Sequence, residues 1–130
     1  MGLADTAKQL QEQEISEGLR FLRHCRHFCS RISVKTINQK NIRLSFLYGI
    51  GTEEAMKEAR KIQGDMVEAA ARLHLYQDIL EKAEKAERQQ KGSGERFACE
   101  NLPRWKKLIL EIHRECEEIR QMPFEVKEGS

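Results

Sequence analysis

The side chains best suited to metal chemistry occur in two short stretches. Cys25 and Cys29 lie four residues apart, and His113 and Cys116 lie three apart, so each pair shares one face of a helix. Three thiolates and one imidazole would form a tetrahedral zinc set. Zinc ligands usually come in pairs from tight turns, however, whereas both pairs here fall within predicted helices and the first pair lies on an apolar stripe. We therefore predict core cysteines, with no metal and no other cofactor.

Cysteine catalysis is the second chemistry that these residues suggest. A reactive thiolate needs a nearby base and an orienting group. His24 precedes Cys25, but neighbours in sequence point apart on a helix, and no glycine-rich turn offers an oxyanion hole. The acidic residues fall on outward helix faces, so a catalytic carboxylate pair is not predicted. We expect a protein that is not an enzyme.

Composition favours one folded domain that spans the 130 residues. Hydrophobic residues make up 39% of the chain, and 23 basic residues nearly balance 21 acidic ones. No apolar stretch is long enough to cross a membrane, and no secretory signal is evident at the N-terminus. The four cysteines are then expected to be free thiols. These features predict an intracellular protein, cytoplasmic or nuclear.

Apolar residues recur at helical spacing along nearly the whole chain. They predict helices over residues 5–32 and 38–48, a long third helix over 52–90, and a fourth helix that begins near Pro103. Ile42, Phe46 and Leu47 are expected on the inner face of the second helix. Gly64 is the expected position of any bend in the third. No segment alternates as a strand does, so the predicted fold is all-α, an antiparallel bundle of about four helices.

Residues 91–95 have the composition of a flexible linker. Gly92-Ser93-Gly94 resembles an engineered join, and Gly129-Ser130 resembles a cloning remnant. One interpretation is therefore an engineered chimera, in which a three-helix part (1–91) is fused to a C-terminal helix (95–128). The other interpretation is a natural surface loop.

The apolar stripe of the fourth helix suggests how the chain is used. Because apolar residues form helix stripes and no polar constellation stands apart from them, we predict a protein–protein interaction module, an adaptor or scaffold. It would recognise an amphipathic partner helix by helix-in-groove binding. The fourth helix is itself the best candidate for an inserted helix, and Trp105 is either a core anchor or an interface hot spot. The predicted partner-binding residues on this helix are Trp105, Leu108, Ile109, Ile112, Cys116 and Ile119.

Residues 59–66, followed by Glu68 and Tyr76, resemble the junction of the last two helices of KIX domains. KIX domains are three-helix modules of transcriptional coactivators, whose hydrophobic grooves receive amphipathic activator helices. The resemblance covers residues 56–80, and the preceding part of the chain does not follow the first KIX helix or its loop. It implies that Tyr76 and Leu80 lie on a groove-lining helix.

Two alternative functions remain open. One is a zinc-stabilised helical domain built on the four ligands named above. The other is a basic module that associates with nucleic acid or an anionic membrane, because the stretch from Arg20 to Arg43 contains no acidic residue. A loose myristoylation pattern at residues 1–6 would add a membrane signal. Acidic neighbouring helices that compensate the charge are the favoured interpretation of this basic face, which is formed by Arg20, Arg23, Arg26, Arg31 and Lys35.

Overall fold

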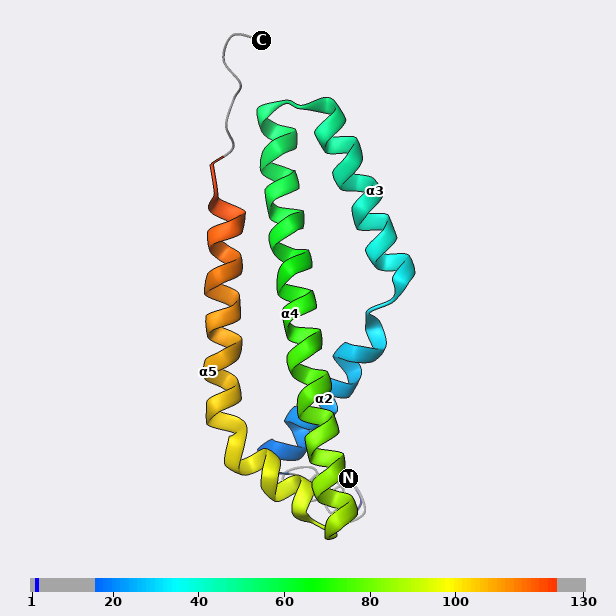
Figure 1. The fold of residues 1–130 in the computed structure, drawn as a ribbon, viewed down its shortest axis with the longest axis vertical. Helices are drawn as coiled ribbons and strands as arrows, with labels where there is room; N and C mark the ends of the chain where they lie inside the picture. The colour runs from blue at the N-terminus through cyan, green and yellow to red at the C-terminus, as the bar shows by residue number, and fades with distance from the viewer. Residues whose placement is uncertain (1, 3–15, 124–130) are drawn as a thin grey trace. The chain divides into compact units, whose positions relative to one another are not determined.

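The computed structural model describes Gly2 and residues 16–123. These residues form four helices and no strand: α2 (Glu17–Arg31), α3 (Val34–Ile50), α4 (Glu53–Gln89) and α5 (Ser93–Gln121) (Figure 1). Short connections join consecutive helices, and α4 is the longest at 37 residues. The predicted all-α helical bundle with one long helix is confirmed. The expected start of the first helix, the myristoylation pattern and residues 124–128 of the fourth helix lie outside the described residues, apart from Gly2.

The chain divides into two compact units. Within the described residues, the first unit contains 16–30 and 75–106, and the second contains 31–74 and 107–123. Both α4 and α5 contribute to both units. A cut at Gly92 would therefore leave neither unit with all of its helices, so residues 1–91 alone do not include a complete unit.

The connection between α2 and α3 is shorter than predicted. Only Ile32 and Ser33 lie outside the helices, because Ser33 caps α3: its side-chain oxygen accepts a hydrogen bond from the Thr36 backbone N–H at 3.2 Å. The sequence pattern left residues 33–37 outside the predicted helices. In the structure α3 begins at Val34, so of these residues only Ser33 lies outside a helix. At its other end, α3 stops at Gly51, whose φ of 68° suits glycine and whose N–H donates to the Leu47 carbonyl at 3.0 Å.

The segment predicted as a flexible linker is a hydrogen-bonded turn. The Glu87 carboxylate accepts from the backbone N–H groups of Gly92 and Gly94, each at 2.9 Å, and these two bonds lower the pKa of Glu87. Gly94 is buried, and an added Cβ would lie 2.9 Å from the Ala83 carbonyl oxygen. The last helix consequently begins at Ser93, and Pro103 lies inside it. Whether the Gly-Ser-Gly sequence is natural or engineered stays an open prediction.

Each unit has its own core. In the second unit, Leu47 of α3 packs with Ala55 and Ala59 of α4, and the half-buried Leu44 and Ile62 extend this cluster. The predicted inner face of this helix is only partly correct, because Leu47 is buried whereas Ile42 and Phe46 are exposed. The buried face follows Leu44 and Leu47, which lie three residues apart on the side towards α4.

Two buried glycines mark close helix contacts. A Cβ on Gly18 of α2 would lie 2.9 Å from the backbone nitrogen of Cys99 on α5. A Cβ on Gly64 of α4 would lie 3.1 Å from the Cys116 carbonyl oxygen. α4 is a single continuous helix through Gly64. This glycine, where a bend was predicted, makes room for α5.

We predict opposite effects for alanine at two helical glycines. Gly18→Ala should lower the free energy of unfolding by about 1–3 kcal/mol, because the added methyl group overpacks the contact between α2 and α5. Gly49→Ala should raise it by about 0.5–1 kcal/mol, because alanine favours the helix and nothing lies within 4 Å of the new Cβ. Urea denaturation followed by circular dichroism measures both. Equal effects would contradict the predicted close contact at Gly18.

Candidate functional site

An aromatic cluster forms the centre of the first unit. Tyr76 of α4 is only 1% exposed, and its ring makes edge contacts with Phe21 and Phe28 of α2 at centroid distances of 5.9 and 5.0 Å. Trp105 of α5 is buried and stacks on Phe21 at 5.5 Å, while Phe97 packs against its edge. Such ring pairs stabilise a core beyond the area that they bury. Trp105 is therefore a core anchor, and α2 covers the Tyr76 ring that the KIX resemblance implied would line a groove.

The other predicted partner-binding residues differ in how far their side chains are buried. Leu80 in the first unit is half-buried, and so are Leu108, Ile109, Ile112 and Ile119 in the second, whereas Cys116 is buried. The stripe from Trp105 to Ile119 is thus divided between the two units. An inserted helix and an ordinary core helix would both bury this stripe. A free surface for an external partner has to lie elsewhere.

All four cysteines are free thiols; Cys25 and Cys116 are buried, Cys29 is half-buried and Cys99 is exposed. Burial raises the pKa of Cys25 to about 12, and the neighbouring Cys29 adds to this shift, so the thiol is protonated at neutral pH. Burial also raises the pKa of Cys116. The first cysteine pair belongs to one unit, whereas His113 and Cys116 belong to the other. Among the described residues, no three metal-ligating side chains come together, so the geometry does not support the zinc alternative.

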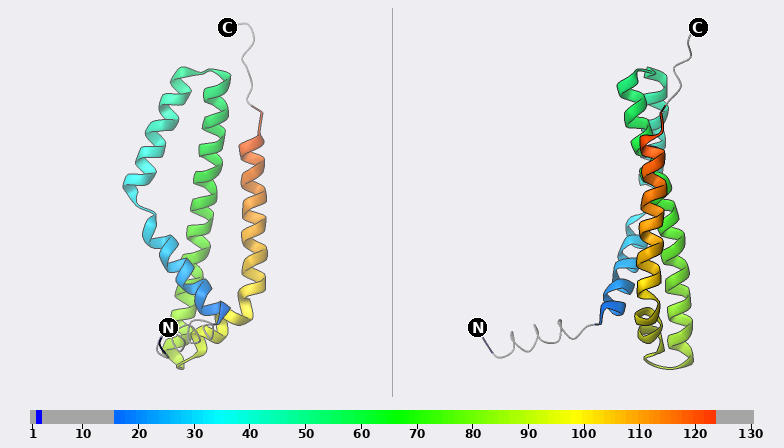
Figure 2. Two further views of the ribbon diagram at one scale, coloured as in Figure 1. Left: turned by 180° about the vertical axis from the view of Figure 1, so that it is seen from behind. Right: turned by 90° about the vertical axis from the view of Figure 1, so that its left-hand side faces the viewer.

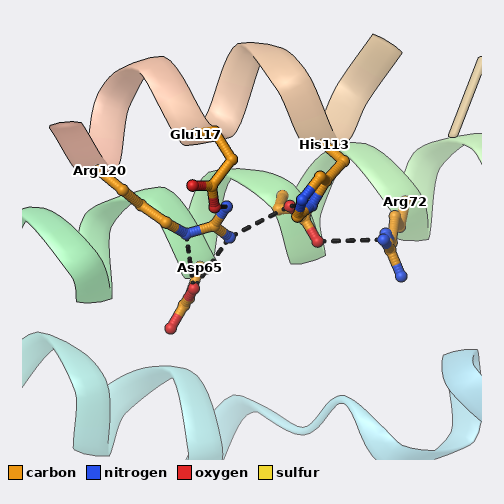
Figure 3. Close-up of polar contacts among 6 residues, drawn as sticks. Asp65, Arg72, His113, Glu117 and Arg120 are labelled. Atoms are coloured by element: carbon orange, nitrogen blue, oxygen red, sulfur yellow. Dashed lines mark hydrogen bonds and ion pairs between the residues drawn. The ribbon is translucent and has the colours of Figure 1, made fainter. Parts of the chain in front are cut away.

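A network of charged side chains joins α4 to α5 in the second unit (Figure 3). Arg120 donates to Asp65 at 2.9 Å, to Glu68 at 3.1 Å and to Glu117 at 2.7 Å. Glu68 also accepts a hydrogen bond from His113 at 3.0 Å. The side chains of Arg120 and Glu68 are only 12% and 14% exposed. Buried charges of this kind persist only when they are paired, so the network fixes the contact between the two helices.

The pKa values follow from these contacts. Burial alone would raise the pKa of Glu68, but hydrogen bonds from His113 and Arg120, together with the positive charge of Arg72, lower it overall. Burial would lower the pKa of Arg120, but its three carboxylate partners raise it overall. Both groups stay charged and saturated with partners at neutral pH. Neither group is therefore a free acid or base for catalysis. The sequence pattern did not predict this network, because its members come from two helices far apart in the chain.

Large apolar side chains on α3 are left uncovered. The side chains of Ile42 and Phe46 are 70% and 58% exposed, and the Arg43 guanidinium lies 5.5 Å from the Phe46 ring centre. α3 packs beside α4 within the second unit, so its outward side has no neighbour among the described residues of that unit (Figures 1 and 2). The exposed apolar residues of α3 are Val34, Ile37, Ile42, Phe46, Tyr48 and Ile50.

A narrow apolar groove lies between α3 and α4. It lies near the N-terminal end of α3, where this helix diverges from α4 (Figure 1). Its volume is about 190 Å³. We call it the α3–α4 groove. Its lining residues are Ile32, Thr36, Ile37 and Lys40 on one side and Met66, Ala69, Ala70 and Leu73 on the other.

The predicted basic face is largely uncompensated. Residues 18–52 contain no acidic side chain. Arg43 pairs with Glu58 at 3.0 Å. In contrast, the exposed side chains of Arg23, Arg26, Arg31 and Lys35 form no ion pair with another described residue, and Arg20 is also exposed. Compensation by an acidic neighbouring helix is therefore seen at Arg43 and not at Arg23, Arg26, Arg31 or Lys35.

No family model, curated protein or solved structure matches this chain. None of the described helices has the length and apolar character needed to cross a bilayer. The features of this fold that bear on function are the uncovered apolar residues of α3, the α3–α4 groove and the basic face.

The charged network predicts a pH-dependent contribution to stability. A lowered folded-state pKa gives stability that is present above the unfolded value of about 4.3 and is lost as the pH falls through the folded value. Glu68→Gln should therefore lower the free energy of unfolding by about 1.5–3 kcal/mol at pH 7, with a smaller difference from wild type below about pH 4. Urea denaturation across pH 3–8 measures this.

The matched control is Glu58→Gln. Glu58 pairs with Arg43 on the surface, where both side chains are about half exposed, so this substitution should cost less than about 1 kcal/mol. A loss at Glu68 that did not change with pH would show that ionisation of Glu68 is not the source of its contribution.

Proposed function

We propose that this protein is a non-enzymatic protein–protein interaction module, an adaptor or scaffold that receives an amphipathic partner helix. The supporting observation is the set of large apolar side chains that α3 leaves uncovered, with Ile42 and Phe46 at its centre. Large apolar side chains that are exposed together on one helix often mark an interaction site. Amphipathic helices bind such surfaces through apolar residues spaced three and four apart.

The chemistry of the remaining side chains also supports a binding role. The thiol of Cys25 is buried and protonated, and Glu68 and Arg120 are fully engaged with partners. No side chain in these groups is both activated and accessible, which a nucleophile or general base requires. We also propose that the protein acts inside the cell, in the cytoplasm or nucleus, and the free state of its four cysteines supports this.

The proposal predicts that partner capture depends on the apolar surface of α3. An Ile42→Ser, Phe46→Ser double variant should keep its thermal stability, because both side chains are exposed, and should recover at least about tenfold less of its partners. The measurement is quantitative mass spectrometry after cross-linking in cells, with the wild-type chain as reference.

The matched control is an Asn38→Ser, Gln39→Ser double variant, which changes two exposed polar residues of the same helix. It should recover partners as the wild type does. If the two double variants recovered the same proteins in the same amounts, the apolar surface of α3 would not be the binding site.

The basic face of α2 favours a second candidate function, association with a polyanion such as nucleic acid or an anionic membrane. The observation behind it is that Arg23, Arg26 and Arg31 form no ion pair with another described residue. Binding to an oligonucleotide or to phosphatidylserine vesicles should then weaken steeply with added salt and with Arg23→Glu. Binding that did not change with salt concentration would contradict this candidate.

A further inference from the structure

The α3–α4 groove has the size of a side-chain pocket. Sites for small molecules and cofactors usually enclose about 300–1,000 Å³, and this groove encloses about 190 Å³. Ala69 and Ala70 of α4 leave space that larger residues would fill, while Ile37 and Leu73 supply apolar walls. The groove therefore suits one or two large apolar side chains carried by a partner.

Of the residues that line the groove, one is charged, and it is a cation. Lys40 lines it, is half-buried and forms no ion pair with another described residue, and Lys35 is exposed in the first turns of the same helix. α3 contains no acidic residue. On α4, the carboxylates of Asp65 and Glu68 pair with Arg120 of α5.

We propose that the α3–α4 groove binds an acidic amphipathic helix. One large apolar side chain of this helix enters the groove, and its flanking carboxylates pair with Lys40 and with the other cations of residues 31–40. Electrostatic complementarity of this type selects between partners and speeds their association. A flat bilayer surface does not fit a narrow concave groove, whereas the ridge of a helix does. The inference rests on the proposed function and specifies the partner's chemistry. Its site is the α3–α4 groove, whose lining does not include Ile42 or Phe46.

The test uses the full chain and a phage-displayed library of helical peptides about 14 residues long, four helical turns. Leucines are fixed at one apolar face, and every other position is randomised. We expect the selected peptides to be enriched in Asp and Glu over Lys and Arg. Fluorescence anisotropy then measures the affinity of the most enriched peptide for the wild-type chain and for single variants.

Three variants locate the binding site. Lys40→Glu should weaken binding at least about tenfold by reversing the charge at the groove. Ala70→Phe should weaken it similarly by filling the groove, and circular dichroism confirms that this variant folds. Lys61→Glu is the matched control, because it makes the same charge change at an exposed α4 residue outside the groove, and it should change affinity less than about twofold.

Several results would overturn the inference. Groove-dependent binders that are neutral or basic would remove the acidic partner and leave the proposed function in place. Acidic binders that respond to Arg23→Glu but not to Ala70→Phe would move the site to α2. If no peptide bound, while phosphatidylserine vesicles or a second copy of this chain bound through the groove, the partner class would be wrong. If the Ile42→Ser, Phe46→Ser variant also kept all cellular partners, the proposed function would fail as well.

Discussion

The length of α4 is the constraint on which the rest of the structure depends. A helix of 37 residues extends about 55 Å, whereas α2 has 15 residues and α3 has 17, so neither can cover it alone. α2 packs in the unit that contains residues 75–89 of α4, and α3 packs in the unit that contains residues 53–74. Ser33 ends one short helix and caps the next. Because α2 and α3 cover different parts of α4, the protein has two separate cores.

Helix type and approximate position were predictable because apolar spacing is a local property. The ends of the helices were not, since they depend on single side-chain contacts. Ser33 extends α3 over a β-branched stretch that propensity alone marks as a break, and Glu87 turns a flexible composition into a fixed turn. The face of α3 was predicted incorrectly because Ile42, Phe46 and Leu47 all fit a helical stripe. The contact of Leu47 with Ala55 and Ala59 of α4 is a tertiary contact, which the stripe does not reveal.

The candidate site shows the same division between local and tertiary information. Sequence spacing placed Trp105 on an apolar stripe, as either a core anchor or an interface hot spot, and identified the run of cations between residues 20 and 43. It could not show that Phe21 stacks on Trp105, or that Arg120 meets carboxylates from a helix more than fifty residues earlier in the chain. The α3–α4 groove was also hidden, because it arises from two helices that diverge and from small residues on α4. None of these features leaves a periodic signal.

The distribution of charge bears most directly on function. α4 stabilises itself with pairs four residues apart, such as Glu53 with Lys57 and Asp78 with Lys82. Residues 18–52 contain no acid that could form such a pair, and the arginines of α2 at positions 20, 23 and 26 repel one another at spacings of three. This arrangement costs helix stability and leaves Lys40 without a partner among the described residues. A helix face needed only for solubility would gain by mixing both signs. We therefore propose a negatively charged partner, whose carboxylates would pair with the cations of residues 18–52, a stretch that contains no acid of its own.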